Sequence, residues 1–415
     1  MKIAIIGAGV SGMTLAYILR DHHDITLYEK NSYIGGHART IKLYDKGRDI
    51  SIDTGFMVFN ENNYPNLIKL FKKLGVGFVN SDMSFGVSIN EGWLEYSSNS
   101  WFKKIKNYFK PAYWLMLYEI IKFNKIAYKS VNIDENLRVC DFLDNIKVSS
   151  WFKNYYLLPM AASIWSSSLQ KVMEMPANTL ITFFRNHGLL SNYKRPIWRT
   201  VSGGSKEYIK KLTSTFKDNI KANTCIKNVT LEKSDITVID DQGNREIFDH
   251  VVFACHGNEV MELLNNQEEK LKNVFKSFKY QKNKIIVHTD VNFMPLDKKC
   301  WASWNYIADV MVNQNSAVSV SYWINNLQNI TYEVPIFITL NPSRRPKETD
   351  IIDEHIFSHP IMDIDSINAQ KEIKTIQGQS NLWYCGAYLG YGFHEDGLVS
   401  AIKIAKEFGV NPKWT

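Results

Sequence analysis

The chain has 415 residues, with 49 basic and 42 acidic side chains and a net charge of +7 at pH 7. Its length suggests two or three domains, and so small a positive excess does not predict binding to nucleic acid. The five scattered cysteines form no CxxC pair, and no apolar run reaches the length of a membrane span, which together favour a reduced, cytoplasmic protein with no metal site.

The first thirty residues have the pattern of a dinucleotide-binding βαβ unit. Lys2–Ile6 and Ile25–Tyr28 are short apolar runs typical of buried parallel strands, and Met13–Leu19 between them has helical spacing. The glycine-rich loop after the first strand allows a tight turn, close approach of a pyrophosphate and close helix packing, and a carboxylate after the second strand can accept the ribose hydroxyls. The cofactor-binding residues predicted here are Gly7, Ala8, Gly9, Val10, Ser11, Gly12, Glu29 and Lys30.

Two motifs follow directly, Gly35-Gly36-His-Ala-Arg-Thr40 and Asp53-Thr-Gly-Phe56. With the βαβ unit they resemble the extended fingerprint of the superfamily of FAD-binding amine oxidases, phytoene desaturases and protoporphyrinogen oxidases. The resemblance implies that the glycine pair lies against the cofactor's phosphates and that the Asp-x-Gly segment passes near the flavin. The family usually has arginine where this chain has His37, and Arg39 is the candidate for the missing charge. The residues carried over are Gly35, Gly36, His37, Arg39, Thr40, Asp53, Thr54, Gly55 and Phe56.

Residues 101–130 combine seven lysines and one glutamate with nine aromatic side chains. Aromatic rings and lysines favour a membrane interface with anionic headgroups. We therefore expect this segment to attach the protein peripherally to the inner face of a membrane. The alternative is a core-packing helix whose lysines face water. The dipeptide Lys110-Pro111 predicts a break between two shorter helices.

The later part of the chain returns to the flavin-binding pattern. A strand begins near Ile226, Val251–Cys255 is a buried strand, and Leu382–Gly386 is another that precedes an amphipathic helix at Leu398–Phe408. The resemblance implies that Ile226 touches adenine through its backbone and that the last helix points its N-terminus at the flavin. Many relatives carry an aspartate where this chain has Ala387, and that aspartate holds the ribityl hydroxyls of the flavin. In this chain the contact with those hydroxyls is lost or supplied by other groups. These motifs add Ile226, Gly386, Ala387, Gly397 and Leu398 to the predicted cofactor residues.

These elements predict an α/β fold with two interleaved domains. The first is an FAD-binding Rossmann-like domain of the glutathione-reductase type, comprising residues 1–80, 195–265 and 375–415. The second is an α+β substrate-binding domain, comprising residues 81–194 and 266–374, with a mixed or antiparallel sheet and a helical cap.

At a finer level, the motifs Asp53–Asn60, Trp301–Tyr306 and Tyr391–Gly397 resemble one subgroup of the superfamily. This subgroup contains flavoproteins linked to cyclopropane- or methyl-fatty-acid synthesis, including the desaturase of furan fatty acid formation and the flavin domain of plant cyclopropane fatty-acid synthases. The resemblance implies an FAD-dependent desaturase that acts on a methyl-branched or unsaturated fatty acyl chain, either free or bound in a phospholipid, with a fatty-acid methyltransferase as a candidate partner. Such a reaction requires a hydride acceptor, a base and a dry channel.

The predicted catalytic residues are Tyr391, His394 and Glu395, in the loop expected to approach the flavin ring. The alternative for the last two is helix capping or cofactor contact without proton transfer. A substrate channel is predicted from the aromatic side chains Trp165, Trp301, Trp304 and Tyr306, although core packing explains each equally well.

Other functions remain open at this stage. An amine oxidase would need an aromatic cage and a lysine that holds water near the flavin, for which Lys284 is a candidate, although an exposed lysine is the simpler interpretation. Carotenoid-type desaturation is compatible with the same fold. A non-catalytic flavin-binding partner of a fatty-acid methyltransferase would bind FAD without being reduced by lipids.

Overall fold

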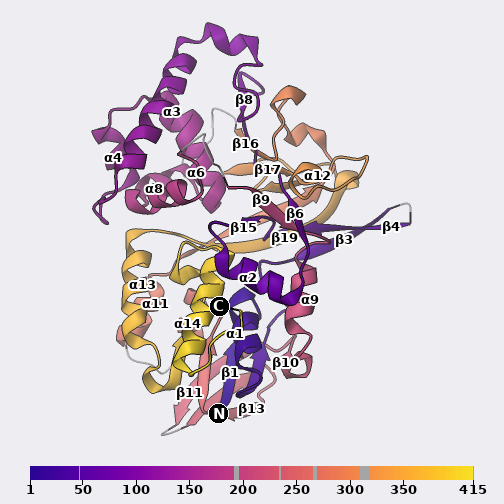
Figure 1. Cartoon of the computed structure of the whole chain (residues 1–415), viewed down its shortest axis with the longest axis vertical. Coiled ribbons are helices and arrows are strands. Elements are labelled where there is room, and N and C mark those ends of the chain that lie inside the picture. Colours follow the sequence, from indigo (N-terminus) through magenta and orange to yellow (C-terminus); the bar gives the residue numbers. More distant parts are fainter. Residues whose placement is uncertain (46, 191–195, 233–234, 265–268, 309–317, 415) are drawn as a thin grey trace.

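The computed structural model describes residues 1–415 except 46, 191–195, 233–234, 265–268, 309–317 and 415. A parallel sheet with its helices lies at one end of the molecule, and a layer of helices that includes α3, α4 and α8 lies at the other (Figure 1). A seven-stranded sheet lies between them. The chain passes between the two sheets several times, so the two halves are interleaved.

The five-stranded sheet is parallel throughout, in the order β10-β2-β1-β14-β20. Its central strands carry consecutive buried apolar residues because both faces of the sheet are covered. The strand bounds are β1 Lys2–Ile6, β2 Asp24–Tyr28, β10 Ile220–Lys221, β14 His250–Phe253 and β20 Leu382–Tyr384. In a parallel sheet the carboxyl ends of the strands share one edge, which is where a ligand binds.

Two layers cover this sheet. One face packs against α1 Val10–Leu19, α2 Pro65–Leu74, α9 Lys206–Thr213 and α14 His394–Glu407. The other face packs against an antiparallel sheet of β11 Ile226–Glu232, β12 Asp235–Asp240 and β13 Arg245–Phe248, and against helices α10 Gly257–Leu263, α11 Glu269–Lys276 and α13 Ile364–Ile376.

The predicted domain ranges need one adjustment. All five parallel strands come from the three ranges predicted for the FAD-binding domain, and all seven strands of the larger sheet come from the other two. Helices α11 and α13 fall within the predicted substrate-binding ranges, yet Phe275 and Ile373 pack in the core beneath the parallel sheet. The predicted boundaries at 194/195 and 265/266 lie partly or wholly outside the described residues.

The seven-stranded sheet has the order β19-β15-β18-β17-β16-β7-β8 and is antiparallel except where β16 pairs with β7. Its strands are β7 Phe85–Ile89, β8 Leu94–Ser97, β15 Tyr280–His288, β16 Trp304–Ala308, β17 Ser319–Trp323, β18 Phe337–Leu340 and β19 Ile351–Pro360. The register places Tyr306, Val320 and Ile285 on one side, here called the inner face, which shares a core with the helical layer. The opposite side, the outer face, carries Trp323 and Phe337.

The helical layer follows β8. It contains the 3₁₀ turn η1 Ile105–Phe109, α3 Pro111–Lys129, α4 Val139–Asn145, α5 Ser150–Phe152, a π-turn at Lys153–Leu157, α6 Leu158–Trp165, α7 Leu169–Glu174 and α8 Ala177–Asn186. The predicted break at Lys110-Pro111 is confirmed, because Pro111 is the first residue of α3. In the described part of the chain, no helix combines the length and apolarity that crossing a membrane requires.

Three short pairings complete the fold. Strands β3 Thr40–Asp45 and β4 Arg48–Asp53 form a hairpin. Strand β9 Trp198–Val201 pairs with β5 Phe59–Asn60 and with β6 Phe78–Asn80. These short pairings connect segments of the chain that lie between the parallel sheet and the seven-stranded sheet.

Candidate functional site

The glycine-rich loop Gly7–Gly12 leads from β1 into α1 and leaves the N-terminus of this helix open. Among the described residues, no side chain caps α1 and no acidic residue lies in its first turn. Gly9 has φ −76°, and a Cβ built on it would have no described atom within 4 Å. Neither backbone conformation nor protein packing therefore requires glycine here. Uncapped amide groups beside open space are what a phosphate group needs at a helix N-terminus.

The glycine pair Gly35-Gly36 lies directly against this loop. The Gly35 amide donates to Ala8 O at 2.8 Å, and a Cβ built on Gly36 would lie 3.2 Å from Gly9 Cα. Gly36 has φ +58°, a conformation that favours glycine. The two glycine segments form the two sides of one cradle, as the family resemblance implies for the cofactor's phosphates.

Glu29 is fixed at the end of β2 beside the cradle. One carboxylate oxygen accepts from the Ala8 amide at 2.9 Å, and the other accepts from the backbone and side-chain nitrogens of Asn31 at 2.9 and 2.8 Å. A carboxylate has about four lone-pair sites, so these three donors leave capacity for a ribose hydroxyl.

Ile226 lies at the same edge of the sheet, whereas Lys30 points elsewhere. Ile226 begins β11 two residues after Thr224, whose amide donates to Glu29 O at 2.9 Å. The Lys30 ammonium is instead 2.5 Å from a carboxylate oxygen of Glu259. This ion pair favours a structural role for Lys30 in joining β2 to α10.

Asp53 is held by protein partners from several segments, and its role as a cofactor contact near the flavin stays a prediction. Its buried carboxylate accepts from Ser205 N and Oγ at 2.8–2.9 Å, from Thr40 Oγ1 at 2.5 Å and from Gln328 Nε2 at 3.0 Å. Burial raises the pKa of Asp53 to about 6. Asp53 and Thr40 therefore act as a structural joint between the β3–β4 hairpin and the start of α9.

Residues 37–39 pair with residues 54–56 next to this joint. Thr54 N donates to Arg39 O at 2.9 Å, and Phe56 N donates to His37 O at 2.8 Å, which leaves no room for a side chain at Gly55. The Arg39 guanidinium forms two hydrogen bonds with Asp353 of β19, at 2.7 and 3.1 Å. The positive charge of Arg39, which we predicted to face the cofactor's phosphates, is therefore paired with the Asp353 carboxylate.

The C-terminal motif brings a second helix N-terminus to the cradle. A Cβ built on Gly397 would lie 2.8 Å from Ser11 Oγ and 3.6 Å from Ala387 N, so the first turns of α14 and α1 meet beside Ala387. Gly386 precedes this contact at the end of β20, and Leu398 is buried in the core between the helices. The first turn of α14 already carries Glu395 and Asp396, so the uncapped N-terminus of α1 is the one that favours a bound negative charge here. The open space at Gly9, the uncapped amides and Glu29 together fit FAD.

Four ring side chains lie deep in the molecule yet keep some accessible surface: His37, His256, Tyr280 and His359. The His37 ring centroid is 4.9 Å from that of Phe357, 5.2 Å from that of His359 and 5.8 Å from that of His256. Because these four side chains lie deep in the molecule and yet keep accessible surface, we infer that they border an internal space. Burial lowers the pKa of all three histidines, that of His359 to about 4, so this wall is uncharged at pH 7.

His394 is held by structural contacts. Its ring stacks on Phe56 with 3.8 Å between centroids, and its Nε2 lies 3.0 Å from Tyr208 Oη. Burial lowers the pKa of His394 to about 3, so it stays neutral. These contacts favour the alternative in which His394 orients Phe56 without transferring a proton. Tyr391 is partly buried in the preceding loop, and its role stays a prediction.

Glu395 caps a neighbouring helix. Its carboxylate accepts from Asn66 N, Asn66 Nδ2 and Leu67 N at 2.7–2.9 Å, at the N-terminus of α2. Burial raises the pKa of Glu395, and the three donors oppose that rise. All three contacts are with protein, which favours capping over the predicted role as a base.

Replacing Glu395 with glutamine tests this role. We expect Glu395→Gln to lower the free energy of unfolding by about 1–2 kcal/mol, because a neutral amide caps a helix less well than a carboxylate. Flavin reduction by substrate should stay within about threefold of the wild type, whereas loss of a catalytic base costs about 10²–10⁴-fold. Denaturant unfolding and rapid-mixing absorbance measure the two effects separately.

An aromatic cluster forms where the helical layer meets the loop before α14. Phe183 stacks on Phe393 at 4.9 Å and on His187 at 3.7 Å between centroids, and Trp165 lies 4.8 Å from Phe183. Phe393 packs against the core of the flavin-binding half and also against the core of the helical layer. The cluster therefore stands at the junction between the two halves. Of its members, the sequence analysis identified Trp165 alone.

The tautomer of His187, a member of this cluster, follows from its hydrogen bond. Its Nδ1 lies 2.9 Å from Phe183 O, and a carbonyl oxygen can only accept, so the hydrogen-bond pattern places the proton on Nδ1 and the lone pair on Nε2. Burial lowers the pKa of His187 to about 4.

The predicted channel residues Trp301, Trp304 and Tyr306, in and just before β16, pack on different faces of the large sheet. Trp304 and Tyr306 lie on the inner face, where the Trp304 ring is 4.8 Å from that of Tyr322. Trp301 packs instead against Trp323 and Phe337 of the outer face, at 5.5 and 5.7 Å. This packing favours the alternative of core packing for Trp301, because the sheet lies between it and the other two.

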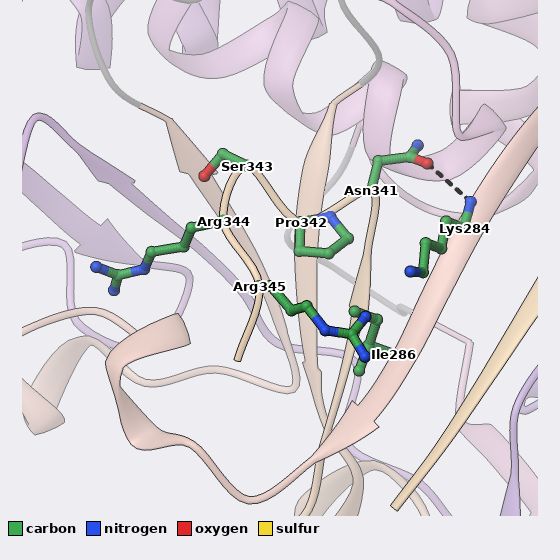
Figure 2. Close-up of a pocket in the computed structure, with 7 residues that line it drawn as sticks. All are labelled: Lys284, Ile286, Asn341, Pro342, Ser343, Arg344 and Arg345. Carbon is green, nitrogen blue, oxygen red and sulfur yellow. Dashed lines mark hydrogen bonds between the residues drawn. The ribbon is translucent and has the colours of Figure 1, made fainter. Parts of the chain in front are cut away.

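Lys284 also lies on the outer face. Its ammonium is 2.8 Å from a Glu354 oxygen, and its backbone amide donates to Asn341 Oδ1 at 3.0 Å. Figure 2 shows it on the wall of an open pocket of about 410 Å³, beside Ile286 and residues 341–345. The inner positions of the same strand are Ile285 and Val287. The exposed side chain favours the simpler interpretation of Lys284 as a surface lysine.

Comparison with known sequences gives a family match over most of the chain. The model of the family described as flavin containing amine oxidoreductase matches residues 10–323. Zeta-carotene desaturase of Capsicum annuum is 42% identical over 76 residues, which cover 18% of this chain and 12% of that protein. The Arabidopsis thaliana zeta-carotene desaturase is 29% identical over 167 residues, covering 37% and 29%. The chain spans less than a third of the length of these two relatives.

Solved structures of similar fold include enzymes that act on different substrates. A CLA-producing fatty acid isomerase from P. acnes aligns with TM-score 0.67 at 15% identity, covering 98% of each chain. Putrescine oxidase bound to putrescine aligns with TM-score 0.69 at 12% identity, covering 98% of this chain and 99% of the other. Cyclohexylamine oxidase from Brevibacterium oxydans aligns with TM-score 0.67 at 14% identity, with the same coverage. These likenesses show the fold, and the predicted fold class is confirmed.

Proposed function

This chain belongs to the family of flavin containing amine oxidoreductases, and we propose that within the family it is a desaturase that removes a hydride and a proton from a fatty acyl chain. It is an oxidoreductase that binds FAD, as the sequence predicts. When bound, FAD supplies the hydride acceptor. The protein's own tasks are to orient the acyl carbon, to exclude water and to receive the proton.

The observation that carries this proposal is the apolar, aromatic core around Phe393, where the helical layer meets the flavin-binding half. Trp165 and Phe183 pack around Phe393, and Trp304 and Tyr306 extend the same core along the inner face. An acyl chain enters such surroundings without losing hydrogen bonds to water, whereas an ammonium group would need a buried partner.

Three deeply placed acids of the described residues, Asp53, Glu395 and Asp396, already have protein hydrogen-bond donors, and Asp396 accepts from Phe393 N at 2.9 Å. Asp53 and Glu395 are each satisfied by three or more protein donors. The histidines beside the cradle and in the cluster are neutral at pH 7. A neutral, aromatic site supports an apolar substrate over an amine.

We propose His187 as the group that receives the proton. Its ring stacks on Phe183 at the junction between the two halves, its tautomer leaves the lone pair on Nε2, and its low pKa keeps that nitrogen unprotonated at neutral pH. A group with so low a pKa is a weak base, so its contribution should lie at the lower end of the usual range, about 10²-fold.

Polyene desaturation is the second candidate. The partial sequence similarity to zeta-carotene desaturases favours it, since a polyene is apolar and fits the same aromatic surface. The two candidates differ in the substrate that the site accepts, and both exclude an ammonium group.

The experiment that tests the proposal is product analysis. Purified protein is incubated in air with phospholipids that bear unsaturated or methyl-branched acyl chains, with a carotenoid polyene, or with putrescine. Mass spectrometry of the lipid should show the loss of two hydrogen atoms from the acyl chain. Conversion of the polyene alone would favour the second candidate, and hydrogen peroxide released only with putrescine would contradict both.

A further inference from the structure

We propose that η1 and the outward side of α3 form a surface that docks on a lipid bilayer with anionic headgroups. This docking surface comprises Phe102, Ile105, Phe109, Trp114, Tyr118 and Ile121. The proposal goes beyond the redox reaction and does not depend on it, because binding to a bilayer can be measured without turnover.

Helix α3 is apolar on two opposite sides. Tyr113, Met116 and Phe123 face inward and are fully buried in the core of the helical layer. Trp114 and Ile121 project outward at helical spacing and stay exposed, Ile121 by 70%. A helix on the surface of a globular protein ordinarily carries polar residues on its outward side. The outward side of α3 therefore needs an apolar partner.

The turn η1 extends this surface ahead of the helix. The side chains of Phe102, Ile105 and Phe109 are 60%, 68% and 82% exposed. The Phe102 ring centroid lies 6.2 Å from that of Trp114, whose Nε1 donates to Tyr108 O at 3.1 Å. These contacts join the turn and the helix into one continuous surface. Contiguous exposed apolar surface of this kind marks an interaction site.

All exposed charged side chains of residues 101–130 are positive. Lys103, Lys106, Lys125 and Lys129 are exposed, at the two ends of the apolar surface. The single acid of residues 101–130, Glu119, is buried and accepts from Ser149 N at 2.8 Å. Exposed aromatic rings flanked by lysines suit the boundary between headgroups and acyl chains, where lysines attract anionic lipids. This charge pattern favours an anionic bilayer over a protein partner.

The position of the docking surface suits delivery of an acyl chain. Figure 1 shows α3 at the end of the molecule opposite β1. The core beneath α3 is continuous with the inner face and includes Trp165 and Phe183, which contact Phe393. A bilayer seated on the docking surface would face the helical layer and leave the flavin-binding half in water.

The test is cosedimentation of the FAD-loaded full chain with phosphatidylcholine vesicles, with and without phosphatidylglycerol. We expect binding to the anionic vesicles, and at least about tenfold weaker partition for Ile105→Asp/Phe109→Asp and for Lys103→Glu/Lys106→Glu. Lys104 is left unchanged because it pairs with buried Glu95. FAD content and the unfolding midpoint of each variant check that it folds normally.

Matched controls carry the same changes elsewhere. Ile247→Asp replaces an exposed isoleucine of β13, and Lys227→Glu/Lys276→Glu reverses two exposed lysines at the flavin-binding end. Both controls should bind as the wild type does. Wild-type protein that does not bind anionic vesicles, or controls that lose as much binding as the docking-surface variants, would overturn the proposal.

Discussion

Replacing Gly9 with tryptophan is expected to give a folded protein that no longer retains FAD. Gly9 has φ −76°, and a Cβ on it would have no described atom within 4 Å, so the polypeptide itself tolerates a side chain there. The indole would occupy the open space beside Gly9 at the N-terminus of α1, where the phosphates are expected. We expect the affinity for FAD to fall by at least about 10³-fold, equivalent to about 4 kcal/mol.

The measurement is the flavin-to-protein ratio after purification, together with circular dichroism and thermal unfolding of the FAD-free protein. Gln242→Trp, in an exposed turn of the same half, is the control and should keep its flavin. A yellow Gly9→Trp protein with one FAD per chain would show that the cofactor does not lie in this cradle.

Replacing His187 with phenylalanine is expected to slow flavin reduction by about 10²-fold while leaving FAD binding intact. Phenylalanine keeps the ring that stacks on Phe183 and removes the Nε2 lone pair. The reduction rate of the wild type should be constant between about pH 6 and 8 and should fall below about pH 5, because His187, with a pKa of about 4, then becomes protonated and cannot accept a proton.

His394→Phe is the matched comparison for this prediction. It keeps a ring against Phe56 and loses the contact between Nε2 and Tyr208 Oη. If His187 receives the proton, His394→Phe should reduce its flavin within about threefold of the wild-type rate. The opposite order of effects, with His394→Phe slow and His187→Phe unchanged, would return the role of base to the loop before α14.

The flavin-binding half could be predicted from sequence because its signals are local. Gly7–Gly12, Gly35-Gly36 and the strand that ends at Glu29 each bring backbone to the cradle by short-range geometry alone. Glycine spacing and a following helix are sufficient to place such groups.

The substrate side could not be predicted, because its residues meet through tertiary packing. His37, His256 and His359 come from three distant segments, and Trp165 reaches Phe393 only when the helical layer closes on the α14 loop. The alternatives left open for Trp301 and Lys284 could not be decided from sequence for a related reason. A change of one residue in register moves a side chain to the other face of a sheet, and the sequence did not reveal which face packs on the core.

His394 and Glu395 illustrate a second limit. Both have the chemistry of a base, and both lie at the start of α14. Their partners Tyr208, Asn66 and Leu67 belong to other helices, so no local pattern shows that the two side chains are already engaged.

The most direct test of an acyl desaturase is anaerobic. FAD-loaded protein is mixed without oxygen with phospholipids that bear methyl-branched or unsaturated acyl chains, and the absorbance of oxidised flavin is followed near about 450 nm. We predict bleaching of the flavin, matched by the loss of two hydrogen atoms from each acyl chain oxidised. Flavin that stays oxidised with every lipid and bleaches on addition of an amine would contradict the proposed function.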